Sequence, residues 1–164
     1  DAANMSAQAG LDFELTRLVR ASILGGYGVK DFDSDSGADL RSFIYRGRID
    51  WSPTQQLSLS FNAGREIATP ATGGGGRVDT NVGANLGLEV TRDLKLTGTL
   101  DYLIADLTDG SRTDEVITVG VGGEYGLGNN LIFTFDYQHR SRDSSDDAYD
   151  LEDNRAMVGV TARF

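Results

Sequence analysis

Apolar and polar residues alternate along several segments of the sequence, and this alternation restricts the fold more than any other feature. In residues 43–51, Phe43, Tyr45, Gly47, Ile49 and Trp51 alternate with Ile44, Arg46, Arg48 and Asp50. Residues 57–64, 82–90, 94–104 and 156–164 alternate in the same way. Side chains on a strand point to opposite faces in turn, whereas residues at i, i+2 and i+4 cannot share one face of an α-helix. The sequence therefore predicts strands with one apolar and one polar face.

Four acidic residues, Glu14, Asp50, Glu89 and Glu124, mark a repeat. Each precedes an apolar or aromatic residue and a tight turn, and the spacings are 36, 39 and 35 residues. Longer Gly-, Asp- and Ser-rich segments lie between these turns, at 32–38, 69–76, 107–112 and 143–150. Short and long connections therefore alternate, as in hairpins that cross a bilayer. The predicted strands are 5–15, 19–31, 39–52, 56–68, 77–91, 94–106, 113–125, 130–142 and 151–164.

The composition excludes several classes of protein. The net charge of −10, from 25 acidic and 15 basic residues, argues against a nucleic-acid partner, which attracts an excess of Lys and Arg. The chain has no cysteine, so disulfides, thiolate chemistry and Cys-ligated metals are excluded. No apolar run approaches the ~18 residues of a membrane helix. A β-barrel needs no such run, because each strand offers only alternate residues to lipid.

Aromatic residues near the predicted strand ends favour a membrane barrel over a soluble one. The expected membrane-interface residues are Phe13, Tyr27, Tyr45, Trp51, Tyr102, Tyr125, Tyr137 and Phe164. Such belts are typical of barrels in contact with a lipid bilayer. We therefore expect one domain over 1–164, an all-β, antiparallel, up-and-down transmembrane barrel of the bacterial outer membrane. A soluble β-barrel that binds a ligand on its apolar face is the alternative.

Three segments carry a family resemblance. Residues 10–17 (GLDFELTR), 50–59 (DWSPTQQLSL) and 153–164 (DNRAMVGVTARF) resemble the putative β-barrel porin 2 family. The resemblance covers nearly the whole chain and implies the C-terminal portion of a longer outer-membrane barrel. In this family the transported substrate is often unassigned, and some members are linked to polysaccharide export. The terminal strand ending at Phe164 resembles the signal that the barrel-assembly machinery recognises in outer-membrane proteins.

Nine predicted strands are an odd number, whereas single-chain bacterial barrels have an even number. One explanation is that the chain belongs to a larger barrel of about 16–18 strands, completed by another segment or by an oligomer. The other is a closed eight-stranded barrel that begins at residue 19 and leaves 1–18 outside. The alternation within 5–15 favours the first explanation.

The polar face supplies the candidate pore-lining residues, which are Arg20, Lys30, Arg46, Arg48, Glu89, Lys95, Asp101, Glu124 and Asp136. They indicate a wall that sorts solutes by charge, with Arg46 and Arg48 as the favoured anion-attracting patch. The alternative is a network that only satisfies buried charges. The repeated acids Glu14, Asp50, Glu89 and Glu124 could form a ring at the periplasmic rim of the barrel, but the favoured interpretation is strand-end anchoring through pairs with Arg17 or Arg92.

We expect no enzyme, metal or cofactor. His139 is the only histidine, and Gly73–Gly76 lacks the Gly-Lys-Ser/Thr of a phosphate-binding loop. The acidic stretches at 31–39 and 143–153 lack the spacing of an EF-hand, so solvated loops are a better interpretation than calcium sites. The first functional hypothesis is a passive channel for small polar solutes or the membrane part of a polysaccharide exporter. The second is a structural or interaction barrel with a plugged lumen.

Overall fold

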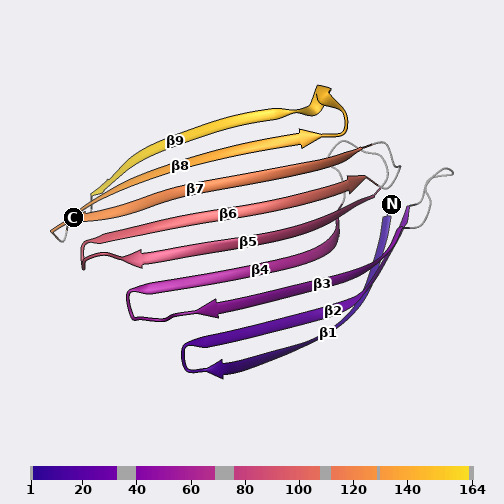
Figure 1. Cartoon of the computed structure of the whole chain (residues 1–164), viewed down its shortest axis with the longest axis horizontal. Helices are drawn as coiled ribbons and strands as arrows, with labels where there is room; N and C mark the ends of the chain where they lie inside the picture. The colour runs from indigo at the N-terminus through magenta and orange to yellow at the C-terminus, as the bar shows by residue number, and fades with distance from the viewer. Residues whose placement is uncertain (1, 33–39, 69–75, 108–111, 129, 163–164) are drawn as a thin grey trace.

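The computed structural model describes residues 2–32, 40–68, 76–107, 112–128 and 130–162. These residues form nine strands and one short 3₁₀ helix, η1 (Asp147–Tyr149). The strands are β1 (Ala2–Thr16), β2 (Val19–Phe32), β3 (Leu40–Trp51), β4 (Leu57–Ala68), β5 (Arg77–Glu89), β6 (Leu94–Leu107), β7 (Thr113–Leu127), β8 (Leu131–Ser144) and β9 (Leu151–Ala162). They lie side by side in one curved sheet, each antiparallel to the next (Figure 1). The predicted all-β, up-and-down fold is confirmed.

The boundaries of the predicted strands agree closely with those of the observed strands. The alternation from which they were predicted also decides which side chains lie on each face. The alternative in which residues 1–18 stay outside a closed eight-stranded barrel is wrong. Residues 2–16 form β1, which pairs with β2 along its length from Ala2 to Thr16. Among the described residues, β1 and β9 are the two edges of the sheet and do not pair with each other. The polar and apolar residues of β1 alternate so that they continue the polar and apolar faces of β2.

Three of the short turns contain a threonine that accepts backbone hydrogen bonds. The Oγ1 atoms of Thr16, Thr54 and Thr91 accept from amides two or three residues further on. Such turns satisfy backbone donors that the ladder leaves free. The turn after β7 instead contains Gly128 at φ 63°, a conformation that favours glycine. Sequence-distant turns are also joined, since the amide of Ser52 donates to the Leu18 carbonyl at 2.8 Å.

The two faces of the sheet differ in crowding. Of the seven described residues other than glycine that are buried, Ile44, Ala105, Val116, Asp79, Asp114 and Ser144 lie on the polar face, and Val78 lies on the apolar face. On the apolar face, large side chains stay exposed, for example Phe43 at 59% and Val158 at 84%. Side chains converge on the concave side of a curved sheet and diverge on the convex side. The polar face is therefore the concave, inner face, and the apolar face is the outer face.

Within the described ranges, no helix is long and apolar enough to span a membrane.

Candidate pore-lining face

The inner face carries continuous polar rows that cross the sheet. One row passes through all nine strands by direct cross-strand partners, namely Glu14, Arg20, Asp50, Ser60, Asn85, Thr99, Gly120, Gln138 and Arg155. The next row continues from Asp12 through Arg48, Asn62 and Asp101 to Arg140 and Asp153. A wall of this composition is suited to contact with water rather than with lipid.

The predicted pore-lining residues are brought together on this face. Arg20, Arg46, Arg48, Glu89, Lys95, Asp101, Glu124 and Asp136 all have inner-face register. The side chain of Lys30 lies outside the described residues, although its backbone belongs to β2. That these residues line a pore stays a prediction, because the open sheet encloses no lumen.

Most basic side chains on the inner face are neutralised by a nearby carboxylate. Six ion pairs join described residues, and all six lie on this face. They are Arg20–Glu14, Arg46–Glu66, Arg48–Asp50, Arg77–Asp79, Lys95–Glu89 and Arg112–Asp114. The contact from Arg48 to Asp50 is two-pronged, with Nε and Nη2 at 2.8 Å from the two oxygens. Arg46 and Arg48 are therefore paired cations rather than a free anion-attracting patch.

The repeated acids pair with other residues than those predicted. Glu14 contacts Arg20 at 3.0 Å and Glu89 contacts Lys95 at 3.2 Å, whereas Arg17 and Arg92 lie in the turns. Arg20 and Lys95 are the cross-strand partners of these acids on the inner face. The hairpin register brings their side chains together, as expected for residues directly opposite each other.

Asp101 and Asp136 are among the inner-face carboxylates that form no ion pair with a described residue; the others are Asp12, Glu124 and Asp153. Asp101 and Asp136 each lie over a glycine of a neighbouring strand. A Cβ added to Gly83 would lie 2.5 Å from Oδ1 of Asp101, and one added to Gly122 would lie 3.1 Å from Oδ2 of Asp136. Both acids are exposed on the inner face. The glycines thus leave room for charged groups that stand free on the wall.

The long connection between β8 and β9 is held against the start of β7. Ser144 Oγ donates to Asp114 Oδ1 at 2.7 Å, and its amide donates to Asp150 Oδ1 at 2.8 Å. The Arg112 guanidinium lies 3.8 Å from the centre of the Tyr149 ring. Acids of the 143–153 stretch therefore serve as hydrogen-bond acceptors. Among the described residues, no three His, Cys, Asp or Glu side chains are arranged to hold a metal ion. The 31–39 stretch lies mostly outside the described residues.

The outer face carries the predicted interface aromatics. Phe13, Tyr27, Tyr45, Trp51, Tyr102, Tyr125 and Tyr137 all have outer-face register, and Phe164 lies outside the described residues. Phe13, Trp51 and Tyr125 lie near the short turns, while Tyr27 and Tyr45 lie nearer the long connections. Tyr137, which was expected near a strand end, lies midway along β8.

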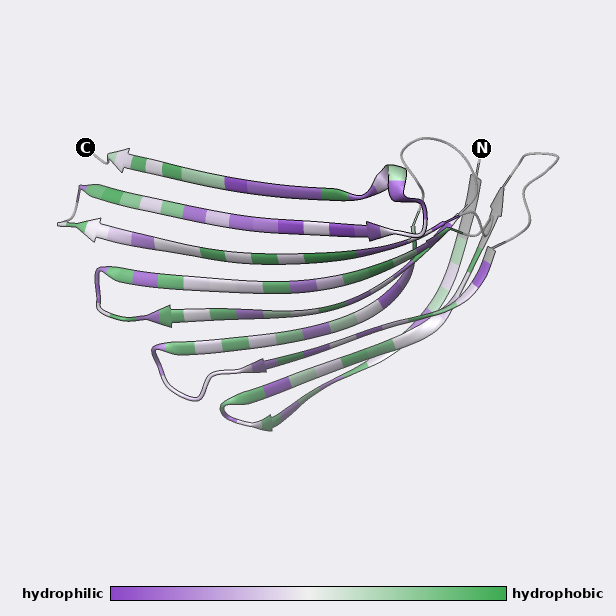
Figure 2. Cartoon of the chain, turned by 45° about the horizontal axis from the view of Figure 1, so that its top comes forward, coloured by the Kyte–Doolittle hydropathy of each residue, from purple (hydrophilic) through white to green (hydrophobic). Residues whose placement is uncertain are grey.

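The apolar part of the outer face is a band that crosses the strands obliquely. On β3 it extends from Trp51 up to Phe43, and Arg41 follows; on β8 it ends at Tyr137, and His139 follows. Figure 2 shows the change along β8 and β9, which are hydrophobic near the short-turn end and hydrophilic toward the other end. Yet Tyr137 lies in the register row of Trp51, through Leu59, Leu86, Gly98 and Val121.

The upper limit of the band on β8 thus lies lower than that on β3 by the eight residues from Phe43 to Trp51, although on β6 the band extends to Ile104, in the row of Tyr45. At about 3.3 Å per residue and about 4.8 Å between strands, the difference between β3 and β8 is a fall of about 26 Å over about 24 Å. If the band lies parallel to the membrane plane, the strands are tilted by roughly 45° from the membrane normal, close to the strand tilt of transmembrane barrels.

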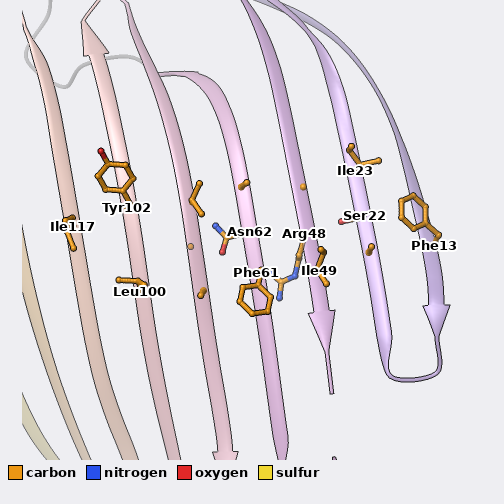
Figure 3. Close-up of a pocket in the computed structure, with 16 residues that line it drawn as sticks. Phe13, Ser22, Ile23, Arg48, Ile49, Phe61, Asn62, Leu100, Tyr102 and Ile117 are labelled. Carbon is orange, nitrogen blue, oxygen red and sulfur yellow. The ribbon is translucent and has the colours of Figure 1, made fainter. Parts of the chain in front are cut away.

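An apolar hollow lies on this outer face, not on the charged wall. It measures about 630 Å³ and has small residues such as Gly47, Ala63 and Ala84 in its lining. Figure 3 shows Phe13, Ile23 and Phe61 around it from three strands, and Leu100 and Tyr102 from a fourth, β6. Its apolar lining excludes it as a site for polar solutes.

The sequence matches the family described as "Putative beta-barrel porin 2" over residues 1–164. The chain belongs to this family. No curated protein sequence matches it. Three solved structures of an outer-membrane protein are similar to this chain.

One is the outer-membrane expressed OmpT of Vibrio cholerae, with a TM-score of 0.62 and 8% identity. Two others are in-vitro folded forms of OmpT from Vibrio cholerae, one described as a trimer, with TM-scores of 0.58 and 0.57 and identities of 12% and 11%. These alignments cover 97–98% of the porin 2 chain but only 55–56% of each OmpT chain. At such low identity they show a shared fold.

Sequence reasoning missed the pairs Arg77–Asp79 and Arg112–Asp114. Both have the spacing of Arg48–Asp50, with one residue between the partners. Residues two apart on a strand share a face, so this Arg-x-Asp spacing is the signal that would have found them.

Proposed function

We propose that the chain forms part of the wall of a passive channel in the bacterial outer membrane. Small polar solutes would diffuse along the inner face, and the channel would act without catalysis. The observation that carries this proposal is the contrast between the two faces. The outer face presents an apolar band at the inclination of a bilayer-spanning sheet, and the inner face presents the ion pairs and free carboxylates.

The proposal requires a barrel larger than the nine strands of this chain. A barrel of about eight strands fills its interior with side chains, whereas one of about 16–18 strands leaves an aqueous channel. The chain spans 56% of the length of an OmpT chain. With the same number of strands per residue, a chain as long as OmpT would have room for about seven strands beyond these nine. Because β1 and β9 run in the same direction, an odd number of further strands gives antiparallel closure.

Conductance in planar bilayers tests this function. The protein, folded in detergent and verified by heat-dependent migration on gels, is added to one side of the bilayer, with heat-denatured protein as the control. The proposal expects discrete conductance steps from the folded sample alone. A folded barrel that inserts without conducting would overturn it and would instead support a plugged, structural barrel.

A further inference from the structure

The free charges on the membrane-spanning part of the inner face are acidic. Asp101 lies between Leu100 and Tyr102, and Asp136 lies between Phe135 and Tyr137, so both stand at levels where the outer face is apolar. We propose that Asp101 and Asp136 make the channel selective for small cations. This inference rests on the proposed channel function and concerns the class of solute that the channel admits.

The basic residues at comparable levels do not oppose this selectivity, because their charge is compensated. Arg48 is held by Asp50 at 2.8 Å, and Lys95 is held by Glu89 at 3.2 Å. Arg20 and Arg46 have Glu14 and Glu66 as partners. Glu124 faces Lys95 from the other side, which adds a second carboxylate to one ammonium. The described inner-face residues in the membrane-spanning part therefore carry more negative than positive charge.

On the inner face, the described arginines without an ion pair are Arg140, Arg142 and Arg155, and they lie at or beyond the upper limit of the apolar band. Arg140 and Arg142 follow Tyr137 on β8, where the outer-face residues are His139 and Ser141. Both faces of the strand are polar there, as expected outside the lipid. Asp153 faces Arg140 across the strand pair, and Arg155 faces Gln138. These groups lie at the mouth rather than in the spanning section.

The glycines Gly83 and Gly122 support the assignment, because they keep the acids on the wall and accessible. Gly83 lies opposite Asp101 and has Asn62 as its polar neighbour on the other side. Gly122 lies opposite Asp136 and has Thr97 as its polar neighbour on the other side. The acids are thus flanked by neutral polar groups instead of cations. Negative groups fixed on a pore wall raise the local cation concentration and lower that of anions.

The reversal potential across a KCl gradient tests the inference. It is measured on the conducting protein, on D101N/D136N and on two control variants. D143N removes one charge from the outer-face side of β8, and R48Q/D50N removes a neutralised pair. We expect D101N/D136N to lower the K⁺/Cl⁻ permeability ratio at least about twofold, and both controls to keep the wild-type ratio.

The outcomes separate this inference from the function on which it rests. Folded D101N/D136N channels that conduct with the wild-type permeability ratio would overturn the cation inference and leave the channel in place. A wild-type channel that prefers Cl⁻ would overturn it as well. Absence of any conductance from the folded wild-type protein would overturn the channel itself, and with it the selectivity.

Discussion

Trp51 and Tyr137 lie in the same cross-strand row, yet they stand at opposite limits of the apolar band on the outer face. Trp51 ends the band of β3 on the short-turn side, and Tyr137 ends that of β8 on the long-connection side. Strand tilt and register stagger occur in every closed β-barrel, but an apolar band that follows this stagger on the outer face is expected where that face contacts lipid. A tilted sheet in a bilayer has such a band.

This oblique band predicts where a charge is costly. Leu86 is an outer-face residue in the row of Trp51, within the band on β5. We expect Leu86→Arg to lower the free energy of unfolding in phospholipid vesicles by about 2–4 kcal/mol. Ser141→Arg, on the outer face of β8 beyond the band, should cost no more than about 1 kcal/mol. Equal costs at the two positions would contradict the oblique band.

The close approach of β1 and β2 predicts a strict requirement for glycine at one position. A Cβ on Gly26 would meet the Ala7 carbonyl oxygen and lie 2.8 Å from Cα of Gln8. Because backbone must move, we expect Gly26→Ala to destabilise the fold by about 1–3 kcal/mol in denaturant titrations. Gly47→Ala is the control, since the nearest atom outside its chain neighbours would lie 4.0 Å from the added Cβ. A neutral Gly26→Ala variant would refute the packing described here.

The threonine turns predict a modest and local loss. Thr91 Oγ1 accepts hydrogen bonds from the amides of Asp93 and Leu94, at 3.3 and 3.1 Å. Thr91→Val removes both and should cost about 0.5–1.5 kcal/mol in unfolding free energy. Hydrogen exchange of the two amides should accelerate. Thr118→Val removes a hydroxyl from the middle of β7 and should leave their exchange unchanged.

The Ser144 hydroxyl anchors the β8–β9 connection to β7. Ser144→Ala leaves the buried Asp114 without this donor, and we expect a loss of about 1–3 kcal/mol. Proteolysis between β8 and β9 should become faster. Ser141→Ala, on the same strand, removes no hydrogen bond among the described residues and provides the control. Unchanged proteolysis of Ser144→Ala would argue against the anchor.

Alternation sufficed to predict the strands and their faces, because residue parity decides the face of a strand, whereas the family was predicted from the resemblance of three short motifs. Alternation did not suffice for the charges. Whether Arg46 is free depends on Glu66, which lies 20 residues away on β4 and has to be brought near by the β3–β4 register. In the same way, Asp101 has no cationic cross-strand neighbour because the register places Gly83 and Thr118 on either side of it. Register is set by turns and by all strands together, so these partners could not be read from one segment.

The most direct test of the account compares two neighbouring residues in the middle of the wall. Asn85 faces inward and Leu86 faces outward on β5, and the chain has no cysteine of its own. Asn85→Cys and Leu86→Cys, in protein folded into lipid vesicles, are treated with a membrane-impermeant, charged thiol reagent. Rapid labelling at position 85 and protection at position 86 is the expected result. Labelling at position 86 with protection at position 85 would contradict a wall with lipid outside and water within.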